Sequence, residues 1–391
     1  MKPFSQLASK ISGQPMFKML EKVQAMERSG RRVLHFELGE PDFDTPPNVV
    51  EAAIQALRCG ETHYTSSAGL FDFREAARQT TVHSRHFLPS LEQVMVTPGA
   101  NAIIYYTMKC VLDPGDEVII PNPGFPTYYA AADAVGAKVV HLKLREERRF
   151  SMDPADVEAA ITPRTKLIVM NTPSNPTGAA MTEEDIRGVA EVARKHDLFL
   201  LSDEIYSRLI FSESRHFFSP SEIDHCKERT IVINGFSKAF AMTGWRLGVA
   251  IGPEDLIRKM ILLNETIVSC VPPFTQRGGI EAILGDHSVA DKMAQAYKER
   301  CFRMVDGLNQ LPGISCYKPD GSIYVFPNIT GTGMTSTQFS DFALAEAGIA
   351  LLPGNNFGEY GEGFVRLSCV NSMRVIEQAL TQLKRALEER K

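Results

Sequence analysis

The sequence has no apolar run that approaches the roughly 18–20 residues needed to span a membrane, and its first residues lack the apolar core of a signal peptide. Its seven cysteines are widely scattered and include no Cys-x-x-Cys pair. An odd, unpatterned set of this kind is typical of reduced thiols rather than of a disulfide framework. We therefore expect a cytoplasmic protein without a membrane partner.

Patterns typical of metal and nucleic-acid binding are also missing. His83 and His86 lie three residues apart, but no cluster of cysteine or histidine accompanies them, so no metal site is predicted. The 42 basic and 47 acidic residues give a net charge of −5 without a block of like charge. Because nucleic acids bind clustered basic faces, we expect no nucleic-acid partner. No G-x-G-x-x-G follows the first predicted strand, which disfavours a nicotinamide-dependent dehydrogenase.

What the sequence does contain is an alternation of short, β-rich apolar runs with segments of helical spacing. The 391 residues suit two domains, at about 100–200 residues per domain. Continuous apolar runs are typical of strands covered on both faces, and strand–helix alternation indicates a largely parallel sheet. We predict an α/β fold with a mostly parallel seven-stranded sheet sandwiched by helices. The predicted strands are Val94–Thr97, Glu117–Ile120, Lys138–Leu142, Leu167–Met170, Phe199–Ser202, Thr230–Asn234 and Gly248–Ile251.

The two ends of the chain have a different pattern. Residues 16–29 have the spacing of an amphipathic helix, and a long charged helix is expected from about Asp286 towards Leu311. Strand-like runs and helices follow it, which indicates a smaller α+β domain. We predict an N-terminal segment of this smaller domain at residues 1–45, a large domain at 46–285 and the C-terminal small domain at 286–391.

Lys238 is the first candidate for a chemical role. It follows a predicted strand and lies in a glycine-punctuated apolar stretch with Phe236, Phe240 and Trp245. Most lysines are solvated surface residues, but these neighbours argue against a solvated face. A desolvated amine near a strand end is able to form a Schiff base with a carbonyl compound, as pyridoxal phosphate requires.

Polar residues also follow other predicted strands, at the sheet edge where α/β proteins bind ligands. Gly99 opens a helix whose backbone N–H groups suit a phosphate, although Pro-Gly is also common turn chemistry. Asn175 lies in a rigid turn that is able to aim its side chain inward, although asparagine is also a common residue in turns for conformational reasons alone. Asp203 and Glu204 end an apolar strand, where a buried carboxylate needs a protonated ring nitrogen, an arginine or a helix end as its partner.

Two arginines complete the candidates. Arg246 follows Lys238 by eight residues and is able to fork onto a phosphate. Arg366 lies in the strand-like Phe364–Ser368, where an arginine needs a partner. A carboxylate ligand and a structural Asp or Glu both satisfy that need, so the residue alone does not decide between them.

Together, these segments resemble the pyridoxal-phosphate-dependent aminotransferases of fold type I, in the class I/II group that includes aspartate, alanine and aromatic aminotransferases. The resemblance covers nearly the whole chain and keeps the family's order. The large domain is then expected to bind the cofactor. The matching motifs are Gly39-Glu-Pro-Asp-Phe43, His63-Tyr-Thr65, Pro98-Gly99, Asn122-Pro-Gly-Phe-Pro-Thr-Tyr128, Asn175-Pro-Thr-Gly178, Asp203-Glu-Ile-Tyr206, Ser237-Lys238, Gly244-Trp-Arg-Leu-Gly248 and Phe364-Val-Arg-Leu-Ser368.

The resemblance implies a role for each matching residue around pyridoxal 5′-phosphate. Lys238 is expected to form the Schiff base and to move a proton between Cα and the cofactor, and Asp203 to pair with the pyridinium nitrogen. Asn175 and Tyr206 are expected to hydrogen-bond the phenolic oxygen of the ring, and Phe125 to stack on the ring. The residues expected to hold the phosphate are Gly99, Ala100, Asn101, Ser237 and Arg246.

On the substrate side, the resemblance implies that Arg366, with Gly39 and Asn175, binds the α-carboxylate. Tyr64 is expected to reach the phosphate of a neighbouring subunit, which implies a homodimer with shared sites. The implied reaction moves an amino group between an amino acid and a 2-oxo acid. Carbon–sulfur β-elimination and cyclase or synthase chemistry use the same residues and stay open as alternatives. Several aspartate-preferring members have a lysine in place of Asn101, so strict aspartate specificity is not expected.

Overall fold

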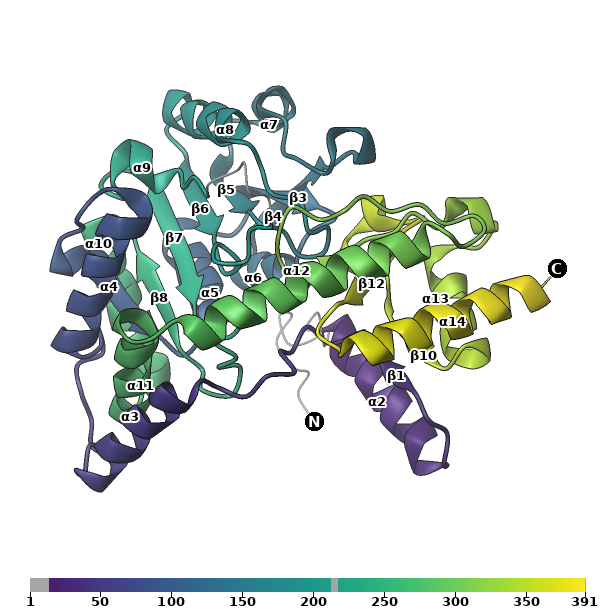
Figure 1. Ribbon diagram of the computed structural model, residues 1–391. Helices are drawn as coiled ribbons and strands as arrows, with labels where there is room; N and C mark the ends of the chain where they lie inside the picture. The colour runs from purple at the N-terminus through teal and green to yellow at the C-terminus, as the bar shows by residue number, and fades with distance from the viewer. Residues whose placement is uncertain (1–13, 212–216, 391) are drawn as a thin grey trace, which may run out of the picture.

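A seven-stranded sheet forms the centre of the computed structural model, which describes residues 14–211 and 217–390 (Figure 1). The strand order is β2-β8-β7-β6-β5-β3-β4. Neighbouring strands from β7 to β4 run parallel, whereas β8 is antiparallel to both of its neighbours. The predicted mostly parallel α/β sheet is therefore confirmed. Its strands are β2 Val94–Thr97, β3 Glu117–Asn122, β4 Lys138–Lys143, β5 Thr165–Asn171, β6 Phe199–Asp203, β7 Thr230–Gly235 and β8 Gly248–Ile251.

The expectation that every strand is covered on both faces is wrong for β4. Every residue of β2, β3 and β8 is buried, whereas in β4 only Leu142 is. Both β2 and β4 lie at an edge of the sheet, but β2 is covered by α4 (Phe71–Arg85) and its Val96 N–H donates to the Ala68 carbonyl, whereas β4 pairs only with β3. An edge strand with polar residues such as Lys138 and Lys143 is not enclosed by its neighbours.

Helices pack on both faces of the sheet. One face shares a core with α5, α6 and α10, and the other is covered by α4 and α11 near β2 and by α7 and α8 towards β3. Thr182 caps the start of α8, because its side chain accepts a hydrogen bond from the Asp185 N–H. The helices are α3 Pro47–Arg58, α4 Phe71–Arg85, α5 Ala100–Val111, α6 Pro126–Val135, α7 Pro154–Ala160, α8 Glu183–Lys195, α9 Ser221–Asp224, α10 Glu254–Val268 and α11 Pro273–Leu284.

The two ends of the described chain lie together, to the right of the large sheet in Figure 1. Strand β1 near the N-terminus pairs in parallel with β10, and β9, β11 and β12 form a separate three-stranded antiparallel sheet. The long helix α12 runs from the large sheet to this region. The domain boundaries at residues 45 and 285 stay a prediction. The elements are α2 Pro15–Arg28, β1 Leu34–His35, α12 Ser288–Leu308, β9 Tyr324–Val325, α13 Ser336–Glu346, β10 Ile349–Ala350, β11 Leu352–Pro353, β12 Val365–Ser368 and α14 Met373–Glu389, with short 3-10 turns at Leu91–Gln93, Glu146–Arg148, Thr330–Thr332, Gly354–Phe357 and Glu359–Gly361.

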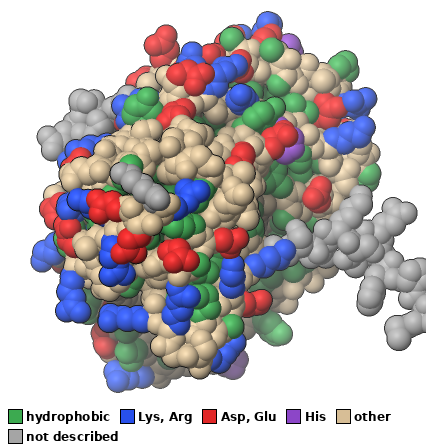
Figure 2. Space-filling view, turned by 90° about the vertical axis from the view of Figure 1, so that its right-hand side faces the viewer, with side chains coloured by type: hydrophobic (Ala, Val, Ile, Leu, Met, Phe, Trp, Pro, Cys, Tyr) green, Lys and Arg blue, Asp and Glu red, His purple; other side chains and the backbone are tan. Residues whose placement is uncertain are grey.

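The surface carries charges of both signs. On the face in Figure 2, Lys and Arg side chains lie among Asp and Glu side chains rather than in a patch of one sign. Charged surface side chains of this protein form ion pairs, such as Arg194 with Glu191 at 2.6 Å and Lys195 with Glu158 at 2.6 Å. Within the described residues, none of the helices combines the length and the apolar character needed to cross a membrane.

Candidate active site

A pocket of about 490 Å³ lies where β5, β6 and β7 end, as the rule for α/β sheets predicts. Among the described residues, Gly99, Arg366 and Tyr64 are the predicted site residues that do not line it. The predicted residues that do line it are Gly39, Ala100, Asn101, Phe125, Asn175, Asp203, Tyr206, Ser237, Lys238 and Arg246.

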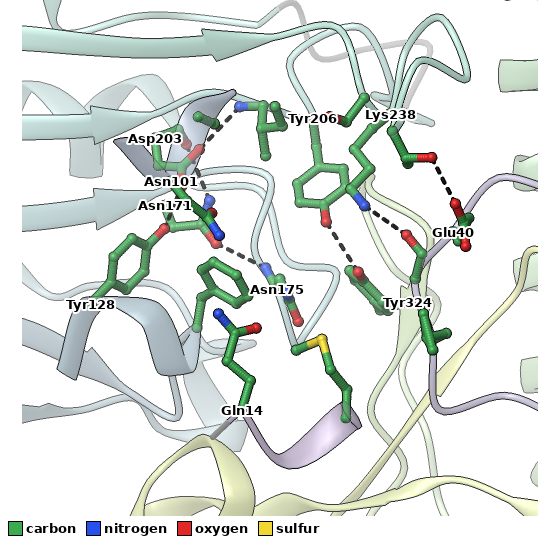
Figure 3. A pocket seen from close by; sticks show the side chains of 18 of the residues that line it. Gln14, Glu40, Asn101, Tyr128, Asn171, Asn175, Asp203, Tyr206, Lys238 and Tyr324 are labelled. Atoms are coloured by element: carbon green, nitrogen blue, oxygen red, sulfur yellow. Dashed lines mark hydrogen bonds between the residues drawn. The ribbon is translucent and has the colours of Figure 1, made fainter. Parts of the chain in front are cut away.

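Asp203 ends β6, is 4% exposed and lines the pocket beside Tyr128 (Figure 3). Tyr128 Oη donates a hydrogen bond of 2.6 Å to Oδ2, and the Ile205 N–H donates one of 3.2 Å to Oδ1. Burial raises the pKa of Asp203 to about 6, although these two hydrogen bonds oppose the rise. Among the described residues, no lysine, arginine or histidine forms a salt bridge with it. The pocket therefore contains a buried acid that lacks a cationic partner.

Glu204, the next residue, has the arginine partner that the sequence left open. Arg85 Nε donates to Oε2 at 2.9 Å, and its Nη2 donates to the same oxygen. Ser202 Oγ and Ser219 Oγ donate to Oε1 at 2.9 Å and 2.5 Å. Glu204 is thus balanced inside the protein and does not line the pocket, so the two carboxylates have different roles.

Lys238 follows β7 and is half-buried. Its Nζ donates a hydrogen bond of 2.6 Å to the backbone carbonyl of Gly39, which is the one hydrogen bond of this amine among the described residues (Figure 3). Gly39 packs closely against the Tyr324 hydroxyl because it has no side chain, and a Cβ there would lie 1.9 Å from Tyr324 Oη. An amine that is bonded only to a backbone carbonyl and a carboxylate without a cationic partner therefore border the same pocket in the described residues.

The N-terminus of α5 and Arg246 form a second part of the pocket. Gly99 is the N-cap of α5 with a φ of 89°, and Ala100 and Asn101 follow it into the first turn. The first N–H groups of a helix lack intrahelical acceptors and favour an anion. A Cβ on Gly99 would lie 2.3 Å from Arg246 Nη2, so the guanidinium packs directly on this helix start. With Ser237, these groups make a site suited to an anion.

Arg366 lies on β12 behind the pocket and is 1% exposed. Its Nη1 donates to Asn175 Oδ1 at 3.2 Å and its Nη2 to the Glu37 backbone carbonyl, while its Nε has no partner. Its guanidinium stacks 4.3 Å from the centre of the Tyr324 ring. Burial lowers the pKa of Arg366, and the nearby Tyr324 and Tyr206 hydroxyls and the Glu37 carboxylate oppose part of this fall. Asn175 and Tyr324 connect it to the pocket.

Three residues in or beside the pocket were missed in the sequence. Tyr128 lies in a motif that was recognised, but its bond to Asp203 joins residues 75 positions apart. Asn171 ends β5 and accepts the Asn175 N–H at 2.8 Å, a contact that the strand-end rule could have found. Tyr324 Oη accepts a hydrogen bond of 3.1 Å from Tyr206 Oη, and no local pattern marks this residue.

Tyr64 lies apart from the pocket of its own chain and is 89% exposed. Phe125, by contrast, lines the pocket and contacts the Tyr128 ring edge-on, with 5.7 Å between ring centres. No group of three or more His, Cys, Asp or Glu residues in the described ranges is arranged to hold a metal ion.

Comparison with known proteins identifies the family. The model of the class I and II aminotransferases matches residues 31–383. The chain is 40% identical to an aspartate aminotransferase of Pyrococcus horikoshii, over 92% of both chains. It is 36% identical to aromatic-amino-acid aminotransferase 2 of Thermococcus litoralis, again over 92% of both.

The protein belongs to the class I and II aminotransferases. The aspartate aminotransferase structure from Rhizobium meliloti has the same fold, with a TM-score of 0.95 and 33% identity over 99% of both chains. The resemblance stated from the motifs is confirmed, and the protein is an enzyme with aminotransferase activity. Enzymes of this family use pyridoxal 5′-phosphate.

Proposed function

We propose that this aminotransferase holds pyridoxal 5′-phosphate in the pocket between Lys238 and Asp203 and moves an amino group between an amino acid and a 2-oxo acid. One observation carries the proposal: a buried carboxylate without a cationic partner borders the same pocket as a free amine. A protonated pyridine nitrogen supplies the cation that Asp203 lacks, and an aldehyde carbon supplies the partner for the amine.

The phosphate of the cofactor fits the opposite part of the pocket. The proposed holders are the N–H groups at the start of α5, the Ser237 hydroxyl and the Arg246 guanidinium. Because Gly99 has no side chain, the Arg246 guanidinium is able to pack against this helix start, where a Cβ would lie 2.3 Å from its Nη2. When bound, the cofactor supplies a conjugated ring that accepts the electron pair released at the substrate Cα.

The protein's own residues then have three tasks. Lys238 is the only lysine among the described lining residues, so it is proposed to hold the cofactor carbon and to move the proton at Cα. Asn175 and Tyr206 are proposed to contact the ring oxygen, and Phe125 to cover the ring face. Asp203 keeps the ring nitrogen protonated by remaining ionised beside it.

Arg366 is proposed to bind the α-carboxylate of the substrate, with Gly39 and Asn175. Its Nε lacks a partner and its burial disfavours the charged form, so an incoming carboxylate would supply a hydrogen-bond acceptor and stabilise the charge. Fixing the carboxylate orients the Cα–H bond towards Lys238, because the substrate is then held at two points.

We also propose that two copies form a homodimer in which Tyr64 reaches the partner's phosphate site. Tyr64 is exposed although it is a large aromatic residue, and its loop is held against α10 by the bond from Asn264 Nδ2 to the Ser67 carbonyl at 2.9 Å. Helix α10 exposes Leu262 and Ile267, which are 53% and 54% accessible. Exposed apolar side chains of this kind beside a loop indicate a protein interface.

The proposal is tested by absorbance and by trapping. We expect the purified protein to carry a cofactor band that an amino acid shifts and a 2-oxo acid restores. Borohydride reduction followed by peptide mass spectrometry is expected to place the pyridoxyl group on Lys238. A label on another lysine, or no label in a cofactor-loaded sample, would contradict the assignment. A panel of amino donors then gives the side-chain preference.

A further inference from the structure

The Arg85–Glu204 ion pair lies one residue from the proposed cofactor acid. Glu204 is 0% exposed and Arg85 is 4% exposed, and α4 carries Arg85 to the back of β6. Both oxygens of Glu204 accept hydrogen bonds, from Arg85 on one side and from Ser202 and Ser219 on the other. The pair is therefore fully enclosed and fully bonded.

The side chains of Asp203 and Glu204 point to opposite sides of the strand end. Asp203 lines the pocket and bonds to Tyr128 of α6, whereas Glu204 bonds to Arg85 of α4 and is absent from the lining. A strand alternates its side chains in this way. Because the two residues are adjacent, the same turn of backbone fixes both, and the charge of Glu204 disfavours the ionised form of Asp203.

Stability alone does not account for such a pair. A buried ion pair is often no more stabilising than apolar residues of similar size, because both charges lose their water. Removing one partner, however, leaves the other as an uncompensated charge. Here the uncompensated charge would lie next to the carboxylate that faces the cofactor. The location of the pair therefore points to the electrostatics of Asp203.

We propose that Arg85 and Glu204 are positioning residues for Asp203: the pair holds the end of β6 and cancels the charge of Glu204, so that Asp203 can carry its own charge towards the pocket. The inference rests on the proposed function, because it assumes that Asp203 meets the ring nitrogen of the cofactor. It assigns Glu204 and Arg85 a part in cofactor binding although neither touches the pocket lining.

The surrounding ionisable groups are few. Asp203 is faced by Tyr128 from α6, by Glu204 on its own strand end and by Tyr206 from the following turn. Glu204 is faced by Arg85 from α4 and by the buried Cys226 thiol after α9. The phenols and the thiol have pKa values raised by burial and stay neutral through the relevant range. In the Arg85–Glu204 pair, a single substitution therefore leaves either an unpaired negative charge or an unpaired positive charge beside Asp203.

Three variants test the proposal through the pH dependence of cofactor affinity. The dissociation constant of pyridoxal 5′-phosphate is measured by equilibrium dialysis against the full-length apoenzyme, from about pH 4.5 to about pH 8.5. Arg85→Gln leaves Glu204 unbalanced, so we expect affinity to be lost at a pH about one unit higher than in the wild type. Glu204→Gln leaves Arg85 unbalanced and is expected to shift this loss in the opposite direction. The double variant is expected to return close to the wild-type profile.

These opposed shifts separate electrostatic positioning from simple damage. Titration of the cofactor itself is the same in every sample, so it cancels between variants. Arg164→Gln, which breaks the Arg164–Glu117 pair at the start of β3, is the matched control and should leave the profile unchanged. Shifts of Arg85→Gln and Glu204→Gln in the same direction, or a double variant as impaired as either single variant, would overturn the proposal. If Arg85→Gln does not fold, the downward shift of Glu204→Gln alone carries the test.

Asp203→Asn separates the proposed role of Asp203 in cofactor binding from the proposed role of the Arg85–Glu204 pair. If it binds the cofactor as the wild type does at every pH, the proposed role of Asp203 fails. If it weakens binding while the Arg85 and Glu204 variants both follow the wild-type profile, only the inference about the ion pair fails.

Discussion

The two walls of the pocket are built in different ways. The strand-end wall consists of residues at the ends of β5 and β6 and after β7, namely Asn171, Asp203 and Lys238. Parallel ladders hold it, with Asn171 opposite Asp203 and Asp203 opposite Ile233. The opposite wall consists of Gly39, Glu40 and Tyr324. Among the described residues, three side-chain hydrogen bonds join it to the strand-end side of the pocket: Lys238 Nζ to the Gly39 carbonyl at 2.6 Å, Thr243 Oγ1 to Glu40 Oε1 at 2.7 Å and Tyr206 Oη to Tyr324 Oη at 3.1 Å.

This difference in construction indicates which ligand each wall suits. A rigid wall suits a cofactor that stays bound and must be held at fixed angles. A wall joined by a few side-chain bonds suits a substrate that enters and leaves in each half-reaction. Substitutions in the strand-end wall should therefore affect chemistry and charge, and those in the opposite wall should affect substrate binding.

The largest effect is expected for Lys238→Ala. Removing the amine removes both the attachment of the cofactor and the base at Cα, so kcat should fall by more than about 10³-fold. Single-turnover absorbance changes measure this loss directly. Lys195→Ala, a surface lysine paired with Glu158, is the control and should keep full activity. Appreciable turnover in Lys238→Ala would contradict the central role of this wall.

Arg366→Ala tests the cation that packs against Tyr324 of the opposite wall. Truncating a buried cation that binds a carboxylate is expected to cost about 2–5 kcal/mol, so KM should rise at least about 30-fold for the amino acid and for the 2-oxo acid. Arg366→Lys should recover only part of the loss, because a lysine does not make the forked contact. A large fall in kcat with an unchanged KM would place Arg366 outside substrate binding.

Asp203→Asn tests the energetic cost of the strand-end wall in the apoprotein. Asp203 has a folded-state pKa of about 6, above the unfolded value of about 3.9, so the folded protein holds the proton more tightly. Wild-type stability therefore falls as the pH rises through this window. Relative to the wild type, Asp203→Asn should gain up to about 3 kcal/mol above pH 6 and almost nothing near pH 4, measured by urea unfolding. A gain that does not change with pH would argue against a strained carboxylate.

The smallest effects are expected from removing the Tyr128 hydroxyl, which bonds to Asp203 of the strand-end wall, and the Tyr324 hydroxyl of the opposite wall. In Tyr128→Phe, Asp203 loses a hydrogen bond that lowers its pKa, so the acid limb of kcat/KM should move to higher pH. In Tyr324→Phe, the neutral bond to Tyr206 is worth about 1 kcal/mol, and the limb should stay in place. Equal shifts in the two variants would remove the distinction between the walls.

Much of the strand-end wall could be predicted from the sequence, because local signals define it. Apolar β-rich runs end at polar residues such as Asp203, and in a parallel sheet those ends meet at one edge. The motifs shared with the family then supplied a proposed role for each residue, which the apolar runs alone left open.

The rest depends on contacts between distant parts of the chain. Arg85 meets Glu204 across 119 positions, and Lys238 meets Gly39 across 199. Apolar runs contain no information about strand direction, so the reversal of β8 was not predictable from its composition. The same holds for β4, since the distant segments that pack around an edge strand decide whether it is enclosed, as α4 and the Ala68 carbonyl do for β2.

The open edge at β4 has a consequence for how copies of the protein meet. A bare strand edge offers unpaired backbone groups to any extended chain, and proteins discourage such pairing with charged side chains. Lys138 and Lys143 stand at the two ends of β4, both exposed. We expect these two charges to discourage edge-to-edge pairing between copies. Replacing both lysines with valine should therefore cause aggregation, an effect that an activity assay does not measure.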